Sequence, residues 1–381
     1  MSSFLTFIIP VIMNCATGGI FFITAYRFSE AGVHKMITTG TMTVWAVIYA
    51  LASLVVGHYA KPSRAYKMLL ICSVALCLTA MGFLIFPSLY MQFVWIVLFA
   101  IVFALFTTPF QVYIKGLKKG TIADVSYSTC KYTISWSLGL ALGAFLFSSM
   151  DWHFSYVLIA VFACIIFFGM MYIEKHRPCC TQEESSNVST VSSEITHKPD
   201  CALLGWILAG CGLFTISIVR TLEPGLALQI NIPLFHIGLI LAFVSVMQAV
   251  VSFVIRKRTK WYYDPKAVLL LGFCGAVGLL LYALHLNCWT LYMASFFYGI
   301  YSGMFYLLSI YHSLVHPYKS PQYVAVNEAI VGISGVLGSL FGGYLAQISN
   351  FKVVFGLCAV IVIVSSIGVA VVLHNKTKKI A

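Results

Sequence analysis

Charged residues are scarce in this 381-residue chain: they make up 9% of it, whereas apolar residues make up 61%. A soluble domain carries about 25% charged and about 45–50% apolar residues. The composition therefore excludes a soluble enzyme, a disordered chain and a disulfide-stabilised scaffold. The sequence also has no CxxC pair, no Cys/His metal pattern, no catalytic triad and no phosphate-binding loop. We therefore expect no catalysis, no metal and no cofactor.

Long apolar runs, in contrast, are abundant, and about 20 apolar residues span a bilayer. The pattern predicts an all-α integral membrane protein with twelve transmembrane helices in two pseudo-symmetric six-helix bundles. The N-terminal bundle covers residues 1–173, a polar cytoplasmic linker covers 174–200, and the C-terminal bundle with a short basic tail covers 201–381. The predicted helices are 4–27, 36–56, 68–86, 93–114, 125–148, 154–173, 201–219, 232–255, 267–285, 289–314, 325–347 and 351–373.

Basic residues indicate the orientation, because they gather in cytoplasmic loops. With the N-terminus placed in the cytoplasm, the outside loops hold only Arg27, Lys35, Arg220 and Lys352, and Lys131 lies within a helix. The other 18 of the 23 Lys and Arg residues then fall inside. We therefore expect a multi-pass protein of the plasma (inner) membrane with both termini cytoplasmic.

Several patterns recur between the two halves at a nearly constant offset, which indicates an internal duplication. The motif R-x-x-E-x-G follows both the first and the seventh predicted helix. Glycines with i, i+4 spacing recur in the fifth and eleventh helices, and a polar residue precedes the sixth and the twelfth. The matched positions are Arg27, Glu30 and Gly32 with Arg220, Glu223 and Gly225; Gly139 and Gly143 with Gly338 and Gly342; and Asp151 with Asn350.

The loop between the second and third helices carries a resemblance to a known family. It contains Gly57, Ala60, Lys61, Arg64 and Lys67, and it is similar to the G-x-x-A-D-R-x-G-R-K loop of the major facilitator superfamily. The six-plus-six layout resembles that superfamily over essentially the whole chain. Lys61 stands where the family has an acid. The resemblance implies transport by alternating access, with helices 1, 4, 7 and 10 around a central site.

The predicted central helices carry mainly neutral polar and aromatic groups. Such a surface suits stacking and hydrogen bonds with a sugar, a nucleoside or a neutral amphiphile. No Asp or Glu is expected near the middle of the membrane, and Pro109 with Gln111 is interpreted as a helix kink. The candidate substrate-binding residues are Asn14, Thr17, Tyr49, Trp136, Gln248, Tyr298 and Tyr301.

The recurring R-x-x-E motif has two interpretations. Arg27 and Arg220 lie at the predicted outer helix ends, each three residues before a carboxylate, Glu30 or Glu223, which favours a structural latch or outer gate formed by local ion pairs. Alternatively, the guanidinium groups bind a phosphate or carboxylate, as the arginines of organophosphate antiporters in the resembling superfamily do.

Lys131 and Glu328 are the clear charges inside the predicted spans, where charged residues are functional candidates. Lys131 could reach the cytoplasmic interface through its long stem, and Glu328 could favour the N-terminal end of its helix. A sharper hypothesis pairs Lys61 with Glu328 as an inner gate, with the signs of the family's pair exchanged. Gly57 and Arg64 belong to the same gating loop.

The predicted function is secondary active or facilitative transport of a small organic solute. The alternatives are an organic-anion antiporter that uses Arg27 and Arg220, and a non-transporting sensor or scaffold with the same fold. The expected partners are a small-molecule substrate, with or without a coupling ion, and the lipid bilayer. We expect a monomer that does not bind nucleic acid.

Overall fold

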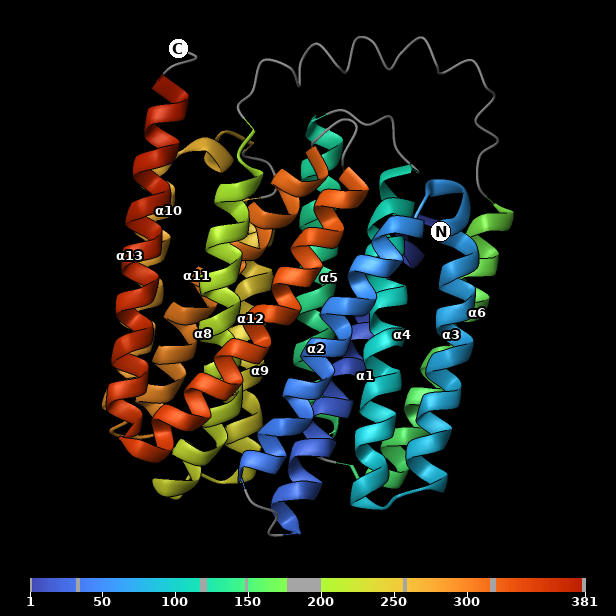
Figure 1. Cartoon of the computed structure of the whole chain (residues 1–381), viewed down its shortest axis with the longest axis horizontal. Helices are drawn as coiled ribbons and strands as arrows, with labels where there is room; N and C mark the ends of the chain where they lie inside the picture. Colours follow the sequence, from blue (N-terminus) through green and yellow to red (C-terminus); the bar gives the residue numbers. More distant parts are fainter. Residues whose placement is uncertain are drawn as a thin grey trace.

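The computed structural model describes residues 2–31, 35–116, 122–147, 150–176, 200–255, 259–315 and 320–378. In these ranges it has twelve long helices, each apolar and long enough to cross a membrane, one short 3-10 helix, and no strand (Figure 1). The first six helices are α1 (Ser2–Glu30), α2 (Lys35–Tyr59), α3 (Pro62–Ile85), α4 (Leu89–Gly116), α5 (Ile122–Phe147) and α6 (Trp152–Lys175). The other elements are α8 (Ala202–Gln229), α9 (Leu234–Ile255), η2 (Thr259–Tyr263), α10 (Pro265–Leu284), α11 (Cys288–Val315), α12 (Ser320–Ile348) and α13 (Phe351–Lys378).

The predicted all-α fold with twelve membrane helices is confirmed. The predicted boundaries of the two bundles stay a prediction, and most of the proposed linker, 177–199, lies outside the described residues. We call α1–α6 the first half and α8–α13 the second half. The start of α1 and the end of α13 lie at the same end of the bundle, which we call the terminal end (Figure 1).

The two halves use the same set of helix contacts. In the first half α1 packs on α5, α2 on α4, and α3 on both α4 and α6. The corresponding pairs of the second half are α8 with α12, α9 with α11, and α10 with both α11 and α13. The halves meet mainly where α2 contacts α12 and where α5 contacts α9. This exchange of equivalent helices agrees with the duplication inferred from the sequence.

The recurring glycines explain one of these shared contacts. A Cβ atom added to Gly139 of α5 would lie 2.4 Å from the Val11 carbonyl oxygen of α1. At the equivalent position in the second half, a Cβ on Gly338 of α12 would lie 2.3 Å from the Phe214 carbonyl oxygen of α8. Only glycine allows the two backbones to approach so closely. The predicted packing role of these glycines is confirmed.

The recurring polar residues begin equivalent helices. The Asp151 side chain accepts a hydrogen bond from the backbone N–H of His153 at the start of α6. The Asn350 side chain accepts one from the backbone N–H of Val353 at the start of α13, at 3.0 Å. Both satisfy a backbone donor that has no partner within its helix.

The outer helices face the surface with apolar side chains, as a membrane protein requires. Leu78 of α3, Phe168 of α6, Phe273 of α10 and Val364 of α13 are all more than 60% exposed. In contrast, 78% of the apolar segment of α11 is buried. The inner helices, which include α1, α8 and α11, therefore supply the interior where polar side chains are sheltered from lipid.

Candidate functional site

Helix α8 continues well beyond its predicted end. The sequence predicted 201–219, whereas the helix covers Ala202–Gln229. It continues because Leu222, Leu226 and Ala227 are buried against neighbouring helices. Arg220 therefore lies about 14 Å before the helix end, at a rise of about 1.5 Å per residue, and not at the outer end where it was expected.

Arg220 lies where the two halves face each other. Its guanidinium carbon is 5.8 Å from the ring centroid of Trp136 on α5, in the other half. It also lies within electrostatic range of the Tyr298 and Tyr306 hydroxyls of α11. Trp136 and Tyr306 in turn contact each other across the boundary, with ring centroids 4.5 Å apart. Side chains of α5, α8 and α11 therefore come together at the boundary, where aromatic rings surround the cationic Arg220.

Arg220 is half-buried, and in the part of the chain that the structure describes no carboxylate forms an ion pair with it. A guanidinium group inside a membrane protein is costly unless an anion, a dipole or an aromatic face compensates its charge. The Trp136 ring provides part of that compensation. An anion that reached this position would provide the rest.

The predicted local ion pair between Arg220 and Glu223 is absent. Glu223 is fully buried, and neither carboxylate oxygen has a hydrogen-bond partner. Its electrostatic neighbours are Tyr282 of α10 and Tyr292 of α11, whereas Arg220 faces Trp136 of α5. The two side chains separate because they leave the helix towards different neighbours.

Arg27, the equivalent arginine of the first half, has different contacts from those of Arg220. The Arg27 Nη2 atom donates to the carbonyl oxygen of Pro87, in the connection between α3 and α4. Its guanidinium also covers the ring of Trp152, 4.2 Å from the centroid. These contacts hold Arg27 against the connection between α3 and α4 and against the start of α6, at the end of the bundle opposite the terminal end. The side chain of Glu30 lies outside the described residues.

Glu328 links the two halves. Its Oε2 atom accepts a hydrogen bond from the Tyr49 hydroxyl of α2, and its Oε1 atom accepts one of 2.9 Å from the Gln111 amide of α4. Glu328 is 6% exposed. The predicted pair with Lys61 is therefore not the arrangement in this structure, since Lys61 is exposed at the start of α3.

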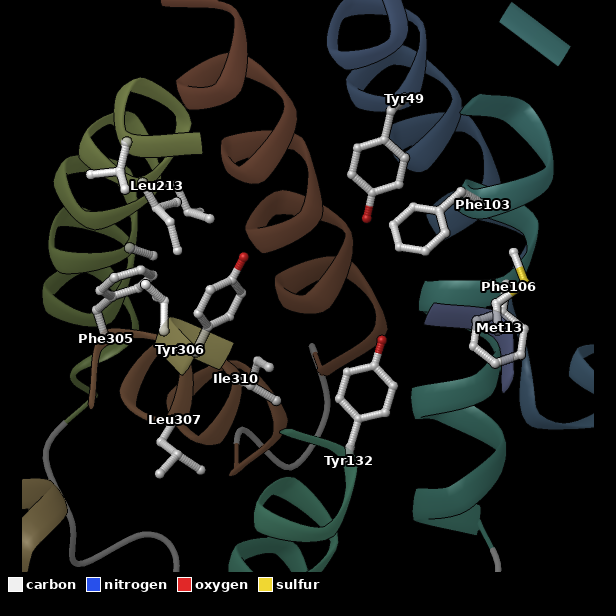
Figure 2. Packing of buried hydrophobic residues seen from close by; sticks show 14 of the residues in the cluster. Met13, Tyr49, Phe103, Phe106, Tyr132, Leu213, Phe305, Tyr306, Leu307 and Ile310 are labelled. Atoms are coloured by element: carbon white, nitrogen blue, oxygen red, sulfur yellow. The ribbon is translucent and has the colours of Figure 1, made fainter. Parts of the chain in front are cut away.

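Three tyrosines surround this contact. Tyr132 of α5 lies within electrostatic range of both Glu328 and Tyr306. Tyr306 lies within range of both Glu328 and Arg220. Figure 2 shows the hydroxyl groups of Tyr49, Tyr132 and Tyr306 directed towards the region between the halves. Polar side chains from both halves thus lie between Glu328 and Arg220. We call this set the polar group; it consists of Tyr49, Gln111, Tyr132, Arg220, Tyr306 and Glu328.

Gln111 is the main residue that the sequence interpretation missed, because it was assigned to a kink with Pro109. The signal was its amide inside a long apolar run of α4. Glu328 is buried in a long apolar helix, as the sequence interpretation placed it, and Glu223, which was expected at an outer helix end, is buried within α8. The burial of Glu223 was not expected because α8 was predicted too short.

The other substrate-binding candidates divide into two groups. Tyr49 lies at the boundary, stacked on Trp45, and Tyr298 lies near Arg220, with its hydroxyl 2.8 Å from that of Thr215. The remaining residues pack inside one half. Asn14 and Thr17 bond to the backbone of α1, Tyr301 packs on Gly275 of α10, and Gln248 is buried beside Gly303 of α11.

The predicted gating loop is shorter than expected. Gly57 lies in the last turn of α2, so it does not form the turn between the helices. The connection consists of Ala60 and Lys61, and Pro62 begins α3. Arg64 is exposed in the first turn of α3. Lys131 does not rely on the interface alone, because its Nζ donates to the Thr6 hydroxyl of α1 at 2.7 Å.

This architecture, with two six-helix halves that share a polar group at their boundary, is the arrangement expected of a membrane transporter. Residues 205–380 match the family model of the Major Facilitator Superfamily. The chain is also similar in structure to the human organic anion transporter MFSD10 (TETRAN), with a TM-score of 0.73. That similarity covers 96% of this chain and 98% of that chain, at 11% sequence identity. No curated protein matches the chain at a significant level.

The family match covers less than half of the chain, and together with the shared fold over the whole chain it makes this protein similar to the transporters of the Major Facilitator Superfamily. These similarities indicate a multi-pass membrane transporter rather than an enzyme. The resemblance inferred from the sequence is confirmed.

Proposed function

We propose that this transporter carries small organic anions and that Arg220 binds their acidic group. The observation that carries the proposal is the half-buried guanidinium group of Arg220 at the boundary between the halves, which faces the Trp136 ring. The guanidinium fork matches the geometry of carboxylate, sulfonate and phosphate groups. We therefore favour an anionic substrate over a neutral one. Of the two arginines considered, only Arg220 is proposed to bind it.

The groups around Arg220 indicate the rest of the solute. Trp136 and Tyr306 offer ring faces from opposite halves, and the Tyr298 hydroxyl lies nearby. Such a surface suits an anion with a flat, apolar body. The structurally similar human protein is named an organic anion transporter, which agrees with this class.

The site also suits alternating access, because its members belong to both halves. Arg220 and Tyr306 move with the second half, and Trp136 moves with the first. A rocking motion would therefore separate the ring faces and release the solute on the other side. We further propose the plasma (inner) membrane as its location, a monomer, and cytoplasmic termini, as the distribution of basic residues predicts.

The test is a binding screen on the purified protein, since a ligand that binds the native state raises its thermal stability. The anions are benzoate, benzenesulfonate and phenyl phosphate, and the neutral compounds are benzenesulfonamide, glucose and uridine. We expect stabilisation by an anion and by none of the neutral compounds. Arg220→Gln should weaken binding by roughly 10–100-fold, because a charge-assisted hydrogen bond contributes about 1.5–3 kcal/mol.

Arg64→Gln is the matched control, because it removes an exposed arginine far from the boundary, and it should bind like the wild type. Uptake of the bound anion into proteoliposomes then separates a transporter from a sensor, which would bind without flux. Stabilisation by glucose or uridine alone would overturn the proposal in favour of a neutral solute.

A further inference from the structure

We propose that Glu223 is a proton-binding site that makes this protein a proton–anion symporter. The inference rests on the proposed function, because it uses the anion at Arg220, and it adds the coupling ion and the residue that binds it. Glu223 is a second buried acid, and unlike Glu328 it does not belong to the polar group between the halves.

In the described part of the chain, the carboxyl group of Glu223 has neither a hydrogen-bond donor nor a cation beside it. Its side chain is 0% exposed, and neither oxygen accepts a hydrogen bond. An ionised carboxylate buried without donors or a cation is strongly unfavourable, whereas a protonated carboxyl is not. In this conformation the group therefore carries a proton.

The side chains that face Glu223 carry no positive charge that could compensate an ionised carboxylate. The titratable neighbours are Tyr282 of α10, and Cys288 and Tyr292 of α11. None of these side chains is cationic at neutral pH. No titratable group among the described residues of α12 and α13 faces Glu223. His236 of α9 contacts Tyr292 and not Glu223. The protonation of Glu223 therefore depends on whether water reaches it.

A chain of exchangeable groups leads from Glu223 towards the end of the bundle opposite the terminal end. Tyr292 lies within electrostatic range of Glu223, and its hydroxyl is 3.0 Å from Nδ1 of His236. His236 is half-buried near the start of α9. The predicted orientation makes this the extracellular end, so the proton enters from outside.

The position of Glu223 on α8 links the proton to the anion. It lies three residues after Arg220, so an ionised Glu223 would compete with a bound anion for the positive potential of Arg220. A protonated Glu223 leaves that potential for the substrate. Binding of the proton therefore favours binding of the anion, and each favours the other equally. Proton and anion then cross together, and the proton leaves Glu223 when water reaches the site on the other side.

The experiment uses benzenesulfonate, whose charge does not change with pH, in proteoliposomes that are acidic outside by one pH unit. The wild type should accumulate the probe about tenfold, since one pH unit corresponds to a factor of ten per coupled proton. Glu223→Gln, which is permanently neutral, should still exchange labelled for unlabelled benzenesulfonate but accumulate none. Glu174→Gln is the control, because Glu174 bonds to Tyr113 near the end of α6, and it should accumulate the probe like the wild type.

Accumulation by Glu223→Gln, or wild-type exchange without accumulation, would overturn the proton site and leave the proposed function standing. Failure of the wild type to bind or exchange any anion would overturn the proposed function itself. An infrared difference spectrum, wild type minus Glu223→Gln at pH 7, tests the site without a substrate. We expect the carbonyl band of a neutral carboxylic acid; carboxylate bands in its place would refute the assignment.

Discussion

The Nε2 atom of Gln111 on α4 donates a 2.9 Å hydrogen bond to the Oε1 atom of Glu328 on α12, so that an amide of the first half holds a carboxyl group of the second. The Tyr49 hydroxyl bonds to the other oxygen of the same carboxyl group. Both oxygens of this buried carboxyl group therefore have a hydrogen-bond donor, as buried polar groups require. This contact therefore fixes the halves relative to each other in the conformation described here.

Exchanging the two groups of this pair should test the contact. Gln111→Glu alone places two carboxyl groups side by side, and Glu328→Gln alone replaces one of the two acceptor oxygens with an NH2 group that cannot accept, so each should reduce transport by about tenfold or more. The double variant restores one amide and one carboxyl group and should recover transport to within about threefold. Uptake into proteoliposomes measures this coupling as a double-mutant cycle. Additive losses in the double variant would show that the pair does not act together.

The aromatic contact of Arg220 should contribute measurably to substrate binding. Trp136→Leu removes the ring that faces the guanidinium, and a cation–π contact contributes about 0.5–2 kcal/mol. We therefore expect the Kd of the bound anion to rise roughly 3–30-fold, whereas Trp136→Phe should lose less because it keeps a ring. Isothermal titration calorimetry gives both values. The control is Trp289→Leu, since Trp289 is 79% exposed on α11; an equal loss there would mean that the effect is not local.

The sequence was sufficient for the helices, because each span needs about 20 apolar residues and few other structures satisfy a backbone in lipid. It also identified Asp151 and Asn350, since the residue that begins a helix acts through its immediate neighbours. It was insufficient for Arg220. The cluster of Arg, Glu, Pro and Gly at 220–225 is typical of a helix end, and only burial of the following leucines keeps α8 helical.

The hydrogen-bond partners of Glu328 could not be predicted from the sequence either. Tyr49 and Gln111 are 279 and 217 positions away in the chain, and helix periodicity does not say which faces of distant helices meet. Lys61 was assigned to Glu328 because the resembling family places a charge there. The structure places an amide and a phenol at that position, both of which bury more cheaply than an ammonium group.

Close packing at the boundary should make Gly332 of α12 sensitive to a single methyl group. A Cβ atom there would lie 2.6 Å from both the Ala46 carbonyl oxygen and the Ala50 Cβ of α2. Gly332→Ala should therefore separate α2 from α12, lower Tm and reduce transport, at a cost of about 1–3 kcal/mol for overpacking. Gly343→Ala is the control on the same helix, because no atom lies within 4 Å of its Cβ position. It should keep Tm or raise it slightly, and a similar loss in both variants would exclude a specific contact between the halves.

The cap of α6 should make the stability of the first half depend on pH. His153 lowers the pKa of Asp151 through a side-chain hydrogen bond of 2.9 Å, and the backbone N–H of His153 adds a second. A carboxyl group with a lower pKa in the folded state than in the unfolded chain stabilises the fold above the unfolded pKa, about 3.9 for Asp. That contribution is lost as the pH falls below this value and the carboxylate is protonated. Tm of the wild type in nanodiscs should therefore fall between pH 6 and pH 3 more steeply than Tm of Asp151→Asn, which keeps the cap but cannot titrate. Parallel curves for the two proteins would show that this carboxylate does not contribute to stability.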